Sequence, residues 1–315
     1  MRELASSKGN PIPKGAVCGE VFTPDALAIR YARWKARRAP YKGTIILLQG
    51  RSEYIEKHFE TVEDLVKNGF DVCTFDFRGQ GGSGRILRDK KRGYIDSFDQ
   101  YVIDLDTVLN EVALPDCRPP YYILGHSTGS LIALIASPIL GNRIQRMVLC
   151  APLIRFGTVP TGQQMTKYLS GLLSVTGLGE MYLSGGPNLT GKRKFMGNHL
   201  TSDTKRFERT REFSRQHPEL VIGGPTAAWV FAACQAMDRV SDPDFIRELH
   251  IPTLLVSGAL DKVVSIEATE LLGRAMRSGR AVTINGARHE LLQERDVYRQ
   301  QLLAALFAFI PGSQS

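Results

Sequence analysis

The chain has 315 residues, 43% of them hydrophobic and 23% charged, with a formal net charge of +8 at pH 7. This is the composition of an ordinary globular protein that buries a sizeable core, arranged as one large domain with an insertion or as two modest domains. The longest apolar run near the C-terminus, Leu302 to Ile310, is far shorter than the roughly 20 residues that cross a bilayer, so no transmembrane helix is expected.

The N-terminal residues and the cysteines favour a cytoplasmic protein. The first twenty residues mix charged residues with Ser, Gly and Pro and lack the apolar core of a signal peptide, so we expect residues 1–15 to form a loose tail. The five cysteines are odd in number and widely spaced, as reduced thiols are. Neither Cys-x-x-Cys nor His-Glu-x-x-His occurs, so we expect no metal and no cofactor.

The first elements predicted are two strands, Ala16 to Phe22 and Ala26 to Trp34, which a turn at Thr23-Pro24-Asp25 joins into a hairpin. The run Thr44 to Leu48 is continuously apolar, which is typical of a parallel strand that is covered on both faces. An amphipathic helix follows it, ends near Gly69 and leads into the next strand.

A glycine-rich loop comes after that strand and formally matches Gly-x-Gly-x-x-Gly through Gly79, Gly81 and Gly84. A dinucleotide site needs a helix N-terminus at the pyrophosphate, but here the basic run Arg85 to Arg92 follows the glycines instead of a helix. The nucleotide interpretation is therefore disfavoured.

Strands and helices then alternate to the end of the chain, apart from one long interruption. Ser97 and Gln100 form a capping-box pattern before a helix from Asp99 to Val112. The remaining core elements are strands at Tyr121–Leu124, Arg146–Ala151, Thr253–Ser257 and Ala281–Ile284, and helices at Ser130–Ser137 and Val297–Phe309. This alternation predicts an α/β fold with a mostly parallel sheet and helices on both faces.

The interruption lies between two strands and predicts an inserted helical cap over residues 152–251, so that residues 16–151 and 252–311 form the core. The inserted segment contains a glycine-rich apolar stretch, a charged stretch and an apolar helix from Ala227 to Met237. Because it follows the C-terminal end of a strand, we expect it to lie over the sheet edge where parallel strands end.

The turn Gly125-His126-Ser127-Thr128-Gly129 connects a buried strand to a helix, which places Ser127 on a strained corner as a candidate nucleophile. The pentapeptide alone is a weak signal, so partners must appear in order behind it. Of the six histidines, only His289 follows a later strand directly. The same filter applied to carboxylates selects Asp261, four residues beyond Ser257.

These residue types together are what acyl transfer requires. His289 would take the proton of the Ser127 hydroxyl and return it to the leaving group, and Asp261 would orient the ring and stabilise the imidazolium. Two backbone N–H groups would hold the oxyanion: that of Thr128, directly after the serine, and that of Arg51, in the loop after the strand at Thr44 to Leu48.

With these residues the chain resembles the α/β-hydrolase superfamily from about Ala16 to Ile310, and within it the bacterial lysophospholipase and monoglyceride-lipase branch. The resemblance rests on four motifs: Gly50-Arg51-Ser52-Glu53, Asp76 to Ser83, Gly125 to Gly129, and His217-Pro218-Glu219-Leu220. It implies an α/β-hydrolase fold, no cofactor, and a cap that shelters one acyl chain. Many relatives have His-Gly where this chain has Gln49-Gly50, so no role of that histidine carries over.

The resemblance implies a serine hydrolase that cleaves monoacyl lipid esters through an acyl-enzyme on Ser127, lysophospholipids first. A monoacylglycerol lipase, a general carboxylesterase, a thioesterase or a perhydrolase would use the same residues, and a non-catalytic ligand receptor on this fold is the alternative of another class. Candidates for the lining of an acyl tunnel are Leu169, Leu172, Leu173, Met181 and Trp229.

Basic residues gather in two segments that we expect on the active-site side. Residues 192–215 contain eight basic and three acidic residues, and residues 85–92 contain five basic and one acidic residue. One hypothesis is that this face docks on anionic lipid at the inner face of the membrane or receives a phosphate head group; scattered solubilising charge is the other. Nucleic-acid binding would rest on charge alone and is not expected.

Overall fold

The structure is a computed structural model that describes residues 3–158, 162–187 and 194–310. Eight strands form one sheet in the order β1-β2-β4-β3-β5-β6-β7-β8. The β1–β2 and β2–β4 pairs are antiparallel, and every other neighbouring pair is parallel. The strands are β1 (Val17–Phe22), β2 (Ala28–Trp34), β3 (Gly43–Leu48), β4 (Phe70–Phe75), β5 (Tyr121–His126), β6 (Ile144–Cys150), β7 (Thr253–Gly258) and β8 (Gly279–Ile284).

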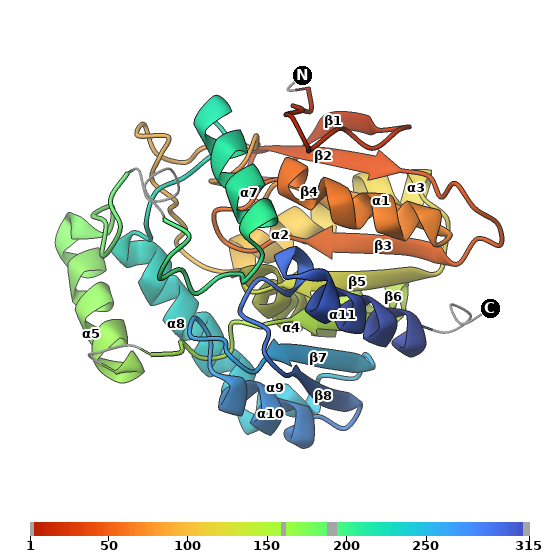
Figure 1. The fold of residues 1–315 in the computed structure, drawn as a ribbon. Coiled ribbons are helices and arrows are strands. Elements are labelled where there is room, and N and C mark those ends of the chain that lie inside the picture. Colours follow the sequence, from red (N-terminus) through yellow and green to blue (C-terminus); the bar gives the residue numbers. More distant parts are fainter. Residues whose placement is uncertain (1–2, 159–161, 188–193, 311–315) are drawn as a thin grey trace.

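Helices cover both faces of this sheet, so the central strands are buried on both sides as their apolar runs predict (Figure 1). One face packs against α1 (Phe59–Lys67) and α11 (Asp296–Phe309). The other packs against α2 (Asp99–Val108), α4 (Thr128–Leu140) and α10 (Ile266–Ala275), and α8 (Ala227–Ser241) rests on α4. The predicted α/β-hydrolase architecture is confirmed.

One predicted helix differs in detail. The expected helix from Asp99 to Val112 begins at Asp99, but with other contacts than a capping box has: the Ser97 hydroxyl accepts the backbone N–H of Asp99 at 3.1 Å, and the side-chain oxygen of Gln100 accepts that of Asp96 at 3.2 Å. The helix then continues through a π-helical turn, Leu109–Ala113, and a last turn, Leu114–Asp116. A π turn inserts one residue into the helical repeat, which local sequence patterns do not signal.

The N-terminal segment is not the loose tail that its composition suggests. From Glu3 onward it packs along the core, and the side chain of Asn10 is buried and donates to the backbone oxygen of Glu56 at 2.8 Å. The indole of Trp34 donates to the backbone oxygen of Pro13 at 3.1 Å. The core therefore supplies the hydrogen bonds that this polar, proline-containing stretch does not make within itself.

The glycine-rich loop after β4 packs on buried charges and makes no close approach to the turn at residues 125–129. A Cβ on Gly81 would lie 2.1 Å from the carboxyl carbon of Asp76, and one on Gly82 would lie 2.4 Å from Nε of Arg30. These two glycines therefore make room for the buried ion pair between Arg30 and Asp76, whose side chains lie 2.6 Å apart.

The chain between β6 and β7 forms helices beyond the carboxyl ends of the parallel strands. Figure 1 shows α5 (Gln163–Leu173) and α8 at this end of the sheet. The π-helical segment η4 (Ser174–Leu178) extends α5, and α7 (Thr204–Gln216) and α9 (Pro243–Arg247) complete the region. No helix in the described ranges is long and apolar enough to cross a membrane.

Candidate active site

Ser127 lies at a sharp corner between β5 and α4. Its backbone has φ 51° and ψ −112°, a conformation that costs free energy for a residue with a side chain and that lifts the hydroxyl out of the sheet. The two flanking glycines permit this corner. A Cβ on Gly125 would lie 3.0 Å from the Cα of Ser130, and one on Gly129 would lie 2.5 Å from the backbone oxygen of Leu48.

The structure brings the three predicted side chains together from separate parts of the chain. Nε2 of His289 lies 3.1 Å from Oγ of Ser127, and Nδ1 of His289 lies 2.7 Å from Oδ2 of Asp261. All three residues are buried. Asp261 follows β7 and His289 follows β8, so each comes from a loop at the carboxyl end of a parallel strand, the same sheet edge as the serine.

The surroundings of Asp261 determine which ring nitrogen of His289 carries the proton. Oδ1 of Asp261 accepts the backbone N–H groups of Val263 and Val264 at 2.7 and 3.1 Å, which fixes the carboxylate. Its Oδ2 can only accept, so Nδ1 of His289 must donate to it. The other nitrogen, Nε2, is then an acceptor that faces the Ser127 hydroxyl, as a general base must.

The two predicted oxyanion donors, the backbone N–H groups of Thr128 and Arg51, belong to two neighbouring segments. Thr128 is the first residue of α4, and its backbone N–H has no acceptor among the described residues. Arg51 lies in the loop after β3, and this loop borders the nucleophile turn because the backbone oxygen of Gln49 would lie 2.6 Å from a Cβ on Gly129. The donors therefore come from two segments whose relative position must be held.

Gln80 holds the loop after β3, a role that its sequence position in the glycine-rich loop did not signal. Its Nε2 donates to the backbone oxygen of Gly50 at 2.9 Å, and its Oε1 accepts the backbone N–H of Ser52 at 3.2 Å. Gln80 is buried, so these bonds are protected from water. Glu53 adds a third restraint because its carboxylate accepts the backbone N–H of Gly50 at 2.6 Å.

Behind this loop lies a buried group of charged side chains that the sequence analysis missed. We call it the Glu53 cluster: it consists of Glu53, Lys57, His58, His126 and Glu290. Burial opposes the ionisation of Glu53, but the charges of Lys57 and His126 outweigh it and hold the pKa of this carboxyl well below 4.5. The exclusion of His126 as the catalytic base agrees with its contacts, which are to Glu53 and not to Ser127.

The side chain of Arg51 connects the loop after β3 (residues 49–53), which we call the oxyanion loop, to the inserted segment. It donates to the backbone oxygen of Gly223 at 3.0 Å, and its guanidinium lies 5.1 Å from the ring centroid of Trp229 on α8. Trp229 is buried and donates through its indole N–H to the hydroxyl of Tyr101 at 3.1 Å. Of the acyl-tunnel candidates, Trp229 is thus a packing residue between the inserted segment and the core.

Of the other tunnel candidates, Leu172 belongs to an exposed apolar face, whereas Leu173 is half-buried. Met165, Tyr168, Leu172 and Val175 recur every three or four residues along α5 and η4, and between 51% and 80% of each is exposed. The opposite side of α5 packs on α8, where a Cβ on Gly171 would lie 2.8 Å from the Phe231 ring. Leu169 and Met181 are also exposed, and so this region offers an outward apolar face.

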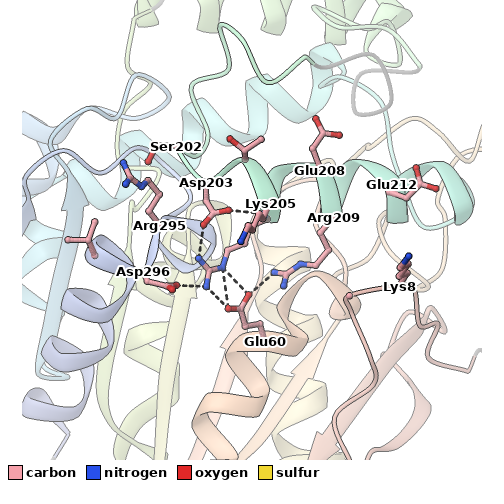
Figure 2. Close-up of a pocket in the computed structure, with 14 residues that line it drawn as sticks. Lys8, Glu60, Ser202, Asp203, Lys205, Glu208, Arg209, Glu212, Arg295 and Asp296 are labelled. Atoms are coloured by element: carbon pink, nitrogen blue, oxygen red, sulfur yellow. Dashed lines mark hydrogen bonds and ion pairs between the residues drawn. The ribbon is translucent and has the colours of Figure 1, made fainter.

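The basic residues of α7 are mostly paired, which corrects their expected role as free positive charge. Arg206 contacts Glu60, Asp203 and Asp296, and Arg209 contacts Glu60, across a surface hollow of about 1170 Å³ (Figure 2). The remaining arginines of the helix pair within it: Arg211 with Glu208 and Arg215 with Glu212. Lys192 and Arg193 of the predicted basic segment lie outside the described residues.

No metal-binding arrangement of three or more His, Cys, Asp or Glu side chains occurs within residues 3–158, 162–187 and 194–310. The Glu53 cluster, with two histidines and two carboxylates, holds the ammonium group of Lys57 instead, which lies 2.7 Å from Glu53 and 2.8 Å from Glu290.

Comparisons with known proteins place these features in context. The sequence matches the family described as serine aminopeptidase, S33, over residues 39–296. It is 30% identical to a probable lysophospholipase L2 of Haemophilus influenzae, and the match covers 84% of this chain and 83% of that protein. It is also 30% identical to lysophospholipase L2 of Escherichia coli K12, and this match covers 90% of this chain and 84% of that protein. A soluble variant of monoglyceride lipase from Saccharomyces cerevisiae superposes with a TM-score of 0.74 at 20% identity, covering 95% of this chain and 97% of that one.

Proposed function

The chain belongs to the serine aminopeptidase S33 family of α/β-hydrolases, and on that premise we propose that it hydrolyses carboxylic esters of monoacyl lipids, lysophospholipids first. The observation that supports this reaction type is the chain of hydrogen bonds that links Ser127, His289 and Asp261. Two relatives at 30% identity, named lysophospholipases, support the substrate class. The intact series disfavours a non-catalytic receptor.

In the proposed mechanism, Nε2 of His289 accepts the hydroxyl proton of Ser127 as Oγ attacks the ester carbonyl. The backbone N–H groups of Thr128 and Arg51 hold the oxyanion. His289 then donates this proton to the departing alcohol, which leaves an acyl group on Ser127. Water attacks that ester with His289 again as the base, and the free fatty acid and the original enzyme result. Asp261 keeps its charge throughout and stabilises the imidazolium.

A side-by-side assay of the purified protein tests this function. The panel is a lysophosphatidyl lipid, a monoacylglycerol, a short nitrophenyl ester and an aminoacyl nitroanilide, the last because the family's description names aminopeptidases. We expect the highest kcat/KM for the lysophosphatidyl lipid. Preference for monoacylglycerol would make the protein a monoglyceride lipase, a substrate supported by the S. cerevisiae structure. Hydrolysis of the nitroanilide alone would refute the ester-hydrolase proposal.

We also propose that residues 152–251 act as the cap and that the protein works in the cytoplasm, in peripheral contact with the inner face of the membrane. The five cysteines are free thiols, as the cytoplasm favours. The apolar face of α5 and η4 is the proposed anchor, because burying such a face in the lipid interface gains about 25 cal/mol per Å². The loop of residues 85–92 adjoins it, since Arg92 lies 3.5 Å from Glu180, and adds positive charge.

A paired substitution, Leu172→Glu with Val175→Glu, tests this contact. Two carboxylates on the apolar face should reduce binding to anionic phospholipid vesicles at least tenfold in co-sedimentation. They remove about 2 kcal/mol of favourable apolar transfer free energy, and they repel the anionic lipid. Activity on the short nitrophenyl ester should stay unchanged. Leu271→Glu is the matched control, since Leu271 is 54% exposed on α10. Equal vesicle binding by the wild type and both variants would refute the anchor.

A further inference from the structure

The Glu53 cluster contacts three of the four segments that carry the proposed catalytic groups: the loop after β3, the turn of Ser127 and the loop of His289. Glu53 belongs to the oxyanion loop, His126 directly precedes Ser127, and Glu290 directly follows His289. The centre of the cluster is buried: Glu53, His58 and His126 are each at most 4% exposed, and the side chain of Glu290 at its edge is 12% exposed. A group of charges at this depth is costly unless every member is paired, so its composition needs an explanation beyond packing.

Glu53 is the centre of the cluster and is fully engaged. Its Oε2 accepts from the backbone N–H of Gly50 at 2.6 Å, and it lies 3.1 Å from Nδ1 of His126 and 3.2 Å from Nε2 of His58. Its Oε1 accepts from Nζ of Lys57 at 2.7 Å. A single buried carboxylate thus joins the oxyanion loop to the strand that ends at the nucleophile.

The contacts of His126 indicate that its ring is an imidazolium. Nδ1 faces the Glu53 carboxylate and Nε2 lies 3.4 Å from the backbone oxygen of His289, and because both partners can only accept, both nitrogens must donate. His58 differs, because its Nδ1 has no hydrogen-bond partner in the described part of the chain. Burial disfavours the charged form of His126, but the Glu53 carboxylate outweighs this and raises the pKa of His126 above its ordinary 6.5.

Lys57 completes the connection to the base. Its ammonium lies between the carboxylates of Glu53 and Glu290, and Glu290 is the peptide neighbour of His289. With His126 protonated, the two cations balance the two carboxylates. The loop that carries the general base is therefore held at two points, the backbone oxygen of His289 and the side chain of Glu290.

We propose that Glu53, acting through His126 and Lys57, is a positioning residue that sets the oxyanion loop and the His289 loop relative to Ser127. This inference rests on the proposed ester hydrolysis by Ser127. The negative charge of Glu53, and not only its shape, keeps the oxyanion donors and His289 aligned while negative charge develops on the substrate oxygen.

Replacing Glu53 with glutamine removes this charge at nearly constant volume. We expect kcat for a short nitrophenyl ester to fall by about 10- to 100-fold with KM nearly unchanged, as supporting-residue substitutions typically do. The rate at which a fluorophosphonate labels Ser127 should fall by a similar factor, because labelling also needs the base and the oxyanion donors. Unchanged kcat and labelling rate in a folded variant would overturn the proposal.

The pH dependence of kcat distinguishes positioning by the charge of Glu53 from positioning by its packing alone. Without the Glu53 carboxylate, His126 should lose its proton at lower pH, so the alkaline loss of kcat should begin at lower pH in Glu53→Gln than in the wild type. A profile of unchanged shape would refute the role of the charge. The ionisable groups that face His126 in this comparison are those of Glu53, Lys57, His58, His289 and Glu290.

Lys57 offers a second test if Glu53→Gln fails to fold. Lys57→Met should lose kcat as Glu53→Gln does, whereas Lys57→Arg, which keeps the charge, should retain most of it. Asp104→Asn is the matched control: Asp104 is a buried carboxylate paired with Arg78 at 2.7 Å, away from the three segments, so it should lower stability and leave kcat unchanged. Equal kcat in both Lys57 variants would contradict the cluster's role.

A nitrogen NMR measurement reads the protonation of His126 directly. At pH 7 we expect the wild type to show an imidazolium signal that is absent from His126→Gln. A neutral His126 at pH 7 would overturn the charge assignment. If the wild type neither hydrolyses esters nor reacts with the fluorophosphonate, the proposed function fails; if it does both while Glu53→Gln matches it, only the positioning role fails.

Discussion

Replacing Ser127 with alanine is expected to abolish ester hydrolysis, with kcat falling by about a million-fold, the scale at which serine hydrolases lose activity without their nucleophile. The physical reason is that no other hydroxyl lies against Nε2 of His289, within 3.1 Å of it, in the described structure. The fold should persist, because the backbone N–H and C=O of residue 127, which bond to Cys150 and Leu153, do not depend on the hydroxyl.

The measurement is steady-state hydrolysis together with fluorophosphonate labelling, and circular dichroism and urea unfolding serve as controls for the fold. Ser83→Ala is a matched control substitution, since Ser83 is equally buried and bonds to the backbone of Arg30 and Asp76, away from Ser127. Retained hydrolysis in a folded Ser127→Ala protein would mean that another residue is the nucleophile.

Replacing Asp261 with asparagine is expected to lower kcat by about ten-thousand-fold. The amide oxygen can still accept the N–H groups of Val263 and Val264, so the loop should keep its shape. Its NH₂ group, however, would face Nδ1 of His289 and favour the tautomer with the proton on Nε2. That nitrogen could then no longer take the proton of Ser127.

Pre-steady-state kinetics on the nitrophenyl ester would locate this loss in acylation, and vesicle binding should stay at the wild-type value. Asp242→Asn provides the comparison, because Asp242 accepts the backbone N–H groups of Asp244 and Phe245 at the start of α9 in the same manner but faces no histidine. A near-normal rate in Asp261→Asn would assign the orienting acid to another residue.

The sequence predicted the sheet and the three proposed catalytic residues because both follow from short-range rules. Continuous apolar runs identify central parallel strands, and the parallel arrangement places the loops after them at one edge. Ser127, Asp261 and His289 each follow a strand directly, so chain order was enough to select them. One resemblance motif ended at Glu53, but no sequence pattern assigned that residue a role.

The remaining features depend on contacts between distant segments. Lys57 joins Glu53 to Glu290, and Arg206 of α7 pairs with Glu60 of α1. Likewise, the buried neighbours of Gly81 and Gly82 come from β2 and the end of β4, and no local pattern reports them. Charge and glycine counts therefore misjudge a surface or a loop when the partner lies far along the chain.

The inserted segment is bound to the core very unevenly. Residues 198–203 are attached to the loop that carries His289: Arg288 donates to the backbone oxygens of Asn198 and Thr201, and Ser202 bonds to Glu294. By contrast, α5 and η4 rest mainly on α8. Grafting α5 and η4 from a relative would exchange the outward apolar face and leave the base in place, so this fold can acquire new lipid preferences by replacing one helical module.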